Sequence, residues 1–244
     1  MGQRLMCVVA HPDDECFAFG GALALAADRD VETYVVCLTD GQAARNRGRA
    51  DSSEELGRIR RAEFAASCKV LGVTHHELLD FEDAQLEFVE FSRAASLLVE
   101  RMRRFRPHVV VTFGGDGGMN AHADHMMASA LTTTAFHWSG QARRFTELGP
   151  VHLPERLFYV TTNVFLPEGT APNPMPWTVE LDVRAVLQQK FEAFRQHVSQ
   201  APLMERTKSF FERHGQQEFY ALVASANPQP AMQMADLFEN MGKS

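Results

Sequence analysis

Short apolar runs alternate along the chain with longer segments of mixed character. Runs rich in apolar and β-branched residues at 5–10, 32–39 and 108–113 predict buried strands. A weaker strand is expected at 77–80, and a further one at 156–162. The run at 108–113 has the strongest strand pattern in the chain.

Helices are predicted between these strands, because apolar residues there recur at a spacing of three and four. Gly72 and Pro107 stand just beyond two of the helical segments, where residues of these types end helices. Strands that alternate with helices predict parallel βαβ units, and therefore an α/β fold with a doubly wound sheet. The helical segments are 17–27, 53–71, 88–105, 124–138 and 183–198.

The second half of the chain is less regular than the first. Residues 167–177 hold four prolines and are expected to form a surface loop. We find no internal repeat, no low-complexity tract and no convincing domain boundary. The pattern therefore predicts one domain over residues 1–244, in which the part from about residue 150 completes a pocket.

Composition narrows the classes of protein that fit this pattern. The 244 residues are 45% hydrophobic and 23% charged, as in a globular protein. A net charge of -7 argues against nucleic acid as a partner, because nucleic-acid-binding domains carry basic patches. No apolar run is long enough for a signal peptide or a membrane span, so a cytoplasmic location is expected.

Four charged or ionisable side chains follow the first predicted strand directly. His11, Asp13, Asp14 and Glu15 fall within five residues. Carboxylates this close repel one another unless positive charge lies among them, and a divalent cation would supply it. Histidine with carboxylate suits zinc best, while iron and other first-row metals remain open. The alternative is a polar turn in which an aspartate caps the following helix.

A second polar cluster follows the strand at 108–113. His122 and His125 are three residues apart at a predicted helix start, and so share one helix face. They could complete a metal site with His11, or could be solvated histidines beside a favourably placed Asp124. Both clusters follow strands, and ligands of doubly wound sheets bind beyond the carboxyl ends of the strands. We therefore expect the two clusters to meet in one metal site.

These residues identify a family. Residues 11–15 and 122–125 resemble the two motifs of the LmbE-like, or PIG-L, family of N-deacetylases. The resemblance implies a Rossmann-like α/β domain with a mostly parallel sheet and helices on both faces. It also implies hydrolysis of an N-acyl group, expected to be acetyl, from an amino sugar or a similar small-molecule amide. Further matches to the family lie at 39–41, 60–63, 71–73 and 190–200.

The resemblance assigns most of the site. It implies that His11, Asp14 and His125 bind Zn²⁺, with Fe²⁺ as the alternative, and that Asp13 is the general base. It gives His122 the role of stabilising the oxyanion or protonating the leaving group.

Three further residues are assigned around this core. Asp124 is expected to orient His122 or His125, as carboxylates near metal sites often do. The resemblance places Arg60 and Asp83 where they would contact substrate hydroxyls.

The second motif departs from the family pattern. Ala123 stands where the family usually has proline, the preceding loop is one residue longer, and no tyrosine lies there. These departures remove no ligand, but they leave the substrate open.

Two other functions are compatible with this sequence. The first keeps the site and changes the substrate, giving an amidase for thiol conjugates or a deacylase for a natural product. The second is a catalytically silent glycan-binding module, against which the intact base and ligand set argue. His197 and Lys190 are expected either to support the site or to act in it. The aromatic residues of the C-terminal half would serve the core or the interface of a homo-oligomer.

Overall fold

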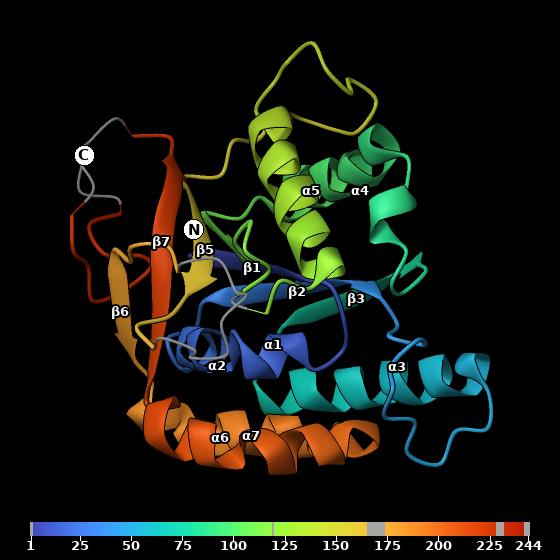
Figure 1. The fold of residues 1–244 in the computed structure, drawn as a ribbon. Coiled ribbons are helices and arrows are strands. Elements are labelled where there is room, and N and C mark those ends of the chain that lie inside the picture. Colours follow the sequence, from blue (N-terminus) through green and yellow to red (C-terminus); the bar gives the residue numbers. More distant parts are fainter. Residues whose placement is uncertain (1, 119, 165–173, 228–231, 242–244) are drawn as a thin grey trace.

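A computed structural model describes residues 2–118, 120–164, 174–227 and 232–241 (Figure 1). Within these ranges the chain forms one seven-stranded mixed sheet between two layers of helices. The five strands from β3 to β5 run parallel, whereas β7 is antiparallel to β5 and β6 is antiparallel to β7. This confirms the doubly wound, mostly parallel α/β fold. The strand order is β3 (His75–Phe81), β2 (Glu32–Thr39), β1 (Arg4–Val9), β4 (Val109–Thr112), β5 (Arg156–Thr161), β7 (Gln217–Ser225) and β6 (Val179–Asp182).

The centre of the sheet is buried on both faces. Strands β1, β2 and β4 are almost wholly buried, as expected of apolar runs in a parallel sheet covered by helices. Cys7 of β1 lies in register between Val35 of β2 and Val111 of β4. Because the chain winds outward from β1 in one direction and from β4 in the other, these two neighbours form the topological switch point of the sheet. Ligands of such sheets bind at this point.

Helices cover both faces of the sheet, as expected (Figure 1). The layer formed by α4 and α5 covers one face, and the remaining helices lie on the other. In that second group α6 packs against α1, α2 and α3. No helix in the described ranges is long and apolar enough to cross a membrane. The helices are α1 (Asp14–Phe17), α2 (Gly20–Asp28), α3 (Ser53–Val70), α4 (Phe91–Phe105), α5 (Ala123–Ser139), α6 (Leu187–Arg195) and α7 (Ala201–His214), with short 3₁₀ turns η1 (Leu86–Phe88), η2 (Arg184–Val186) and η3 (Val198–Gln200).

The helix predicted at 17–27 corresponds to α2, which begins three residues later than expected, and a separate short helix, α1, precedes it. α1 ends at Phe17, and α2 starts afresh at Gly20. The carboxylate of Glu218 accepts hydrogen bonds from the backbone N–H groups of Gly21 and Ala22, at 2.7 and 2.9 Å, and so caps α2. A Cβ at Gly21 would lie 2.3 Å from a methyl carbon of Val183, so only glycine fits there. The break therefore depends on partners far away in the sequence.

The helix predicted at 88–105 begins three residues later than expected. The side chain of Glu90 accepts from the backbone N–H groups of Ser92 and Arg93 and starts α4 at Phe91. Residues 86–88 form the 3₁₀ turn η1 instead. By contrast, α3 starts at the predicted Ser53, because Ser52 Oγ accepts from the backbone N–H of Glu55 at 3.1 Å.

The C-terminal half holds more regular structure than the sequence predicted. The helix predicted at 183–198 is reduced to α6, with 3₁₀ turns before and after it. Strands β6 and β7 and helix α7 were not predicted. Of the predicted loop at 167–177, residues 167–173 lie outside the described ranges, and residues 174–177 contain neither helix nor strand.

Candidate metal centre and active site

Both polar clusters lie at the topological switch point. His11 follows β1, and the loop that leads to His125 follows β4, the parallel neighbour of β1. Asp13 adopts a positive φ of 107° in the turn between β1 and α1. This conformation is costly for a residue with a Cβ and is frequent at functional sites. The two segments meet as the sequence predicted.

The three predicted metal ligands form a compact triangle of donor atoms. His11 Nδ1 lies 3.2 Å from His125 Nε2 and 3.5 Å from an oxygen of Asp14, whose other oxygen lies 3.2 Å from His125 Nε2. A tetrahedral zinc ion with bonds of about 2.0–2.2 Å requires donors about 3.3–3.6 Å apart. The donor set and its spacing therefore fit a zinc-like divalent cation.

Hydrogen bonds hold the two histidine rings with these atoms facing one another. His125 Nδ1 lies 3.0 Å from the carbonyl oxygen of Gly117, a contact that requires Nδ1 to carry the proton and leaves Nε2 as a lone-pair donor. On His11 the Nε2 atom lies 3.0 Å from Asp83 Oδ1 and 3.2 Å from Asp124 Oδ2, which leaves Nδ1 toward Asp14. Carboxylates commonly orient metal-binding histidines in this way.

Asp124 was expected to orient His122 or His125, but its carboxylate contacts His11 instead. The same carboxylate accepts from the backbone N–H groups of Ala84 and Leu86, at 2.7 and 3.2 Å. The loop that follows β3 thereby fixes Asp124 against His11. This loop lies some 40 residues away along the chain, so no local motif indicated the pairing.

The centre strongly favours positive charge. Burial opposes the charged form of His11, but Asp124, Asp14 and Asp83 raise its pKa well above the ordinary value. Burial likewise opposes the charged form of Asp14, and His125 and His11 hold its pKa well below the usual range. A divalent cation among these groups would supply the charge that the carboxylates require.

Other groupings of ionisable side chains lie close to the same residues. Within the described residues, His11 also lies close to His122 with His125, and to Asp83 with Asp124. The carboxylates of the second grouping already accept backbone hydrogen bonds, in the case of Asp83 from Ala43 N at 3.0 Å. They are therefore better placed to orient His11 than to bind an ion.

A third grouping, around Glu15, supports the turn that contains Asp13. The carboxylate of Glu15 accepts from the backbone N–H of Asp13 at 2.9 Å and contacts Ser67 and His197 Nε2, the latter at 2.7 Å. Glu15 and His197 are fully buried. Burial opposes the charged form of each, but the contact between them lowers the pKa of Glu15 and raises that of His197. This pair holds the backbone of the Asp13 turn.

Asp13 lies between the metal centre and Arg60. Its Oδ2 atom accepts from Arg60 Nη2 at 3.0 Å. Burial raises the pKa of Asp13, Arg60 lowers it and the charge of Asp14 raises it, and the resulting pKa is about 6. A carboxylate that titrates near neutrality is suited to take up and return a proton.

His122 stands at the rim of the centre. Its ring centroid lies 4.8 Å from that of His11 and 4.9 Å from that of His125, and the residue is exposed. Its Nδ1 accepts from the backbone N–H of Asp124 at 3.2 Å, so the neutral ring carries its proton on Nε2. Burial and the two neighbouring histidines lower the pKa of His122.

Arg60 and Asp83, the two residues predicted to contact substrate, are buried within the site. Arg60 is 3% exposed and donates to the carbonyl oxygens of Pro12 and Gly41 as well as to Asp13. Asp83 contacts His11 and the backbone N–H of Ala43. Contact of either residue with substrate hydroxyls stays a prediction.

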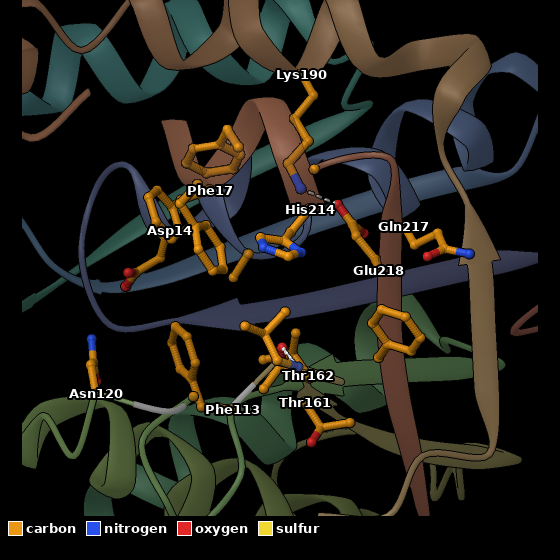
Figure 2. Close-up of a pocket in the computed structure, with 18 of the residues that line it drawn as sticks. Asp14, Phe17, Phe113, Asn120, Thr161, Thr162, Lys190, His214, Gln217 and Glu218 are labelled. Atoms are coloured by element: carbon orange, nitrogen blue, oxygen red, sulfur yellow. Dashed lines mark hydrogen bonds and ion pairs between the residues drawn. The ribbon is translucent and has the colours of Figure 1, made fainter. Parts of the chain in front are cut away.

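A cavity of about 210 Å³ opens beside Asp13, Asp14 and His125 (Figure 2). It extends from this site towards Lys190 and Glu218, which face each other across its far end (Figure 2). Sequence reasoning did not identify Glu218, because nothing near it in the sequence signals a site. The structure thus defines a class of α/β protein with a candidate metal centre, an adjacent carboxylate and a cavity at the switch point of the sheet.

The family model described as GlcNAc-PI de-N-acetylase, PIG-L, matches residues 6–136, which is more than half of the chain. The chain therefore belongs to the PIG-L family, as its motifs indicated.

Relatives and solved structures agree with this assignment. The 1D-myo-inositol 2-acetamido-2-deoxy-alpha-D-glucopyranoside deacetylase of Rhodococcus jostii is 29% identical over 240 residues, covering 81% of this chain and 82% of the relative. The N,N'-diacetylchitobiose deacetylase of Pyrococcus horikoshii superposes with a TM-score of 0.73 at 21% identity, over 91% of this chain and 84% of that one. The 4-carboxy-2-hydroxymuconate hydratase of Pseudomonas putida superposes with a TM-score of 0.71 at 19% identity, over 93% of this chain and 99% of that one. Since a hydratase shares the fold, the reaction has to be argued from the site.

Proposed function

We propose that the protein is a zinc-dependent N-deacetylase that hydrolyses the acetamido group of an amino sugar or a sugar-like small molecule. The single observation that carries the proposal is the meeting of His11, Asp14 and His125 with Asp13 beside one cavity. Membership of the PIG-L family and the deacetylase relative from Rhodococcus jostii support the choice of an acetylated amino sugar.

In this proposal His11 Nδ1, Asp14 and His125 Nε2 hold the divalent cation. Zinc suits two imidazoles and one carboxylate, and Fe²⁺ is the alternative for the same ligands. When bound, such an ion supplies a Lewis acid that polarises an amide carbonyl and makes water more acidic. Asp83 and Asp124 accept from His11 Nε2 and keep its Nδ1 directed at the ion-binding position.

Asp13 moves the proton. Its carboxylate takes a proton from the water that attacks the amide carbon, and a C–O bond forms as the carbonyl becomes an oxyanion. The C–N bond then breaks, and Asp13 returns the proton to the departing nitrogen, so the products are acetate and a free amine. A pKa of about 6 lets one group serve in both steps near neutral pH.

His122 stabilises the developing oxyanion. Because its pKa is lowered, the ring acts as a neutral donor through Nε2–H rather than as an imidazolium ion. Preorganised donors of this kind contribute about 10²–10³ in rate. Its position at the rim, beside the rings of His11 and His125, suits a group that contacts substrate.

The test is acetate release from N-acetylglucosamine and its simple glycosides by zinc-loaded protein, with and without a chelator. Release that the chelator stops and added zinc restores is the expected result. The Asp13→Ala variant should lose turnover and keep one zinc per chain. If that variant turns over at a rate near wild type, Asp13 is not the base. Bound zinc without release from any of these compounds would exclude them as substrates and point to another acyl group or a larger scaffold. If the protein neither releases acetate nor binds zinc, that outcome would favour a silent binding module.

A further inference from the structure

The cavity beside the candidate metal centre is lined mainly by apolar side chains, with polar groups in the minority of its surface. From Asp14 it passes between the rings of Phe17 and Phe113 towards β5, β7 and α7 (Figure 2). Apolar lining of this kind favours an apolar ligand group, because burying such surface is what stabilises the bound state. Its apolar walls include Phe17, Phe113, Val160, Leu203, Phe210 and Phe211.

Several polar side chains around this cavity are already engaged with the protein. Thr161 Oγ1 donates to the carbonyl oxygen of Met175 at 2.9 Å, and Thr162 Oγ1 accepts from the backbone N–H of Val164 at 3.0 Å. At the far end Lys190 Nζ donates to Glu218 Oε1 at 2.6 Å. A sugar ring in this cavity would have to compete for these groups, and a buried hydroxyl without a partner is costly.

The size of the cavity restricts its occupant to part of a substrate. At about 210 Å³ it is smaller than the roughly 300–1,000 Å³ typical of sites that enclose a whole small molecule. Because Asp13, Asp14 and His125 form one end of it, whatever fills it is attached close to the reacting amide. The sugar itself would then lie at the exposed side of the centre, towards His122.

We propose that the cavity binds an apolar alkyl or aryl substituent that the substrate carries next to its scissile amide. The proposal rests on the proposed deacylase function and narrows its substrate class to amphiphilic amides. The substituent has two chemical sources, the acyl group itself or the aglycone of the sugar. Both present the same apolar surface to the same walls, so experiment has to distinguish them.

The test compares two series of substrates with zinc-loaded protein. One series is N-acetyl-, N-butyryl- and N-hexanoylglucosamine, and the other is the methyl, butyl and octyl glycosides of N-acetylglucosamine. Release of free amine gives kcat/KM for each compound. We expect a rise on the order of threefold for each methylene that enters the cavity. A rise in the first series assigns the cavity to the acyl group, and a rise in the second assigns it to the aglycone. Flat or falling values in both series, with N-acetylglucosamine still cleaved, would overturn the proposal and leave the deacetylase function standing.

A substitution that fills the cavity provides the second readout. Val160→Phe should abolish the dependence on chain length, whereas Val223→Phe, on the neighbouring strand and outside the lining, should keep it. Calorimetric titration of the same compounds into zinc-loaded Asp13→Ala protein measures occupation without turnover. One outcome would separate the two proposals. If wild-type protein cleaves none of these compounds, but their affinity for the Asp13→Ala protein still rises with chain length, the deacetylase function fails. If Val160→Phe then removes that rise in affinity, the cavity is as proposed. Affinity independent of chain length would refute the cavity proposal.

Discussion

Arg60 Nη2 lies 3.0 Å from Asp13 Oδ2, and both residues are buried. Arg60 comes from the middle of α3 and also donates to the carbonyl oxygen of Gly41 at 2.9 Å. A Cβ at Gly41 would lie 1.9 Å from Arg60 Nη1, and the residue has a positive φ, so only glycine admits the arginine. The guanidinium is therefore positioned to lower the pKa of the Asp13 carboxyl.

Removal of Arg60 is expected to shift the acidic limb of the pH profile. The base must be ionised to act, so kcat/KM should fall as the pH drops through the pKa of Asp13, which is about 6. Because Arg60 lowers that pKa, Arg60→Met should move the limb to higher pH. The measurement is kcat/KM for amide hydrolysis between pH 4.5 and 8.

The adjacent Arg61 supplies the control for that measurement. Its guanidinium pairs with Asp40 and Asp80 rather than with the Asp13 carboxylate. Arg61→Met should therefore leave the limb in place. An Arg60→Met limb that coincides with wild type would show that the arginine does not act on the base.

The zinc content of variants should distinguish the proposed metal ligands from His122, which lies at the rim of the centre. His125→Ala removes one corner of the donor triangle and should abolish stoichiometric zinc after dialysis, as measured by mass spectrometry of the metal. His122→Ala should keep one zinc per chain and lose about 10²–10³ in kcat through the missing oxyanion donor. His76→Ala, an exposed position on β3, is the control for both. Zinc retained by His125→Ala but lost by Asp83→Ala would instead place the ion on the Asp83 side of His11.

The buried pair of Lys190 and Glu218 should contribute strongly to stability. Both side chains are about 95% buried, and Glu218 also accepts from Gly21, Ala22 and the hydroxyl of Tyr220. Lys190→Met leaves that carboxylate buried without its cation, which costs on the order of 3–5 kcal/mol in the free energy of unfolding. Urea denaturation measures this loss.

An exposed pair on the same helix gives the comparison. Arg195 pairs with Glu192 at 3.1 Å on the solvent side of α6. Exposed pairs contribute about 1 kcal/mol or less, so Arg195→Met should change the free energy of unfolding little. Equal losses for Lys190→Met and Arg195→Met would contradict the role given to the buried pair. The double variant Lys190→Met with Glu218→Gln should recover part of the loss, because no buried charge remains.

The central sheet and its helices were predictable because their signals are local. The apolar runs of β1, β2 and β4 are buried on both faces, which leaves a continuous pattern in the sequence. Helix α3 carries its own cap at Ser52, and the prediction of its start was correct. The C-terminal strands β6 and β7 were missed, since they are antiparallel additions to the edge and their sequence carries no turn signal that joins them.

The meeting of the two histidines proposed as metal ligands was also predictable, for a topological reason. Residues that directly follow β1 and β4 must meet if those strands are parallel neighbours, so His11 and His125 come together across 114 positions. The side chains that orient these histidines follow no such rule. Asp124 was expected beside His122 or His125, yet its carboxylate contacts His11, because the loop after β3 holds it there.

The sequence by itself determined the fold class, the edge of the sheet where the candidate site lies and the types of side chain that meet there. Periodicity, helix caps and strand ends are properties of neighbouring residues, so they can be read without the fold. Tertiary structure decided the break between α1 and α2, the support of the Asp13 turn and the apolar cavity. Each depends on a contact across the whole chain, such as Glu218 with Gly21 at 197 positions and His197 with Glu15 at 182. Such contacts exist only once the chain has packed, because burial and hydrogen bonding act on distance in space and not on distance in sequence.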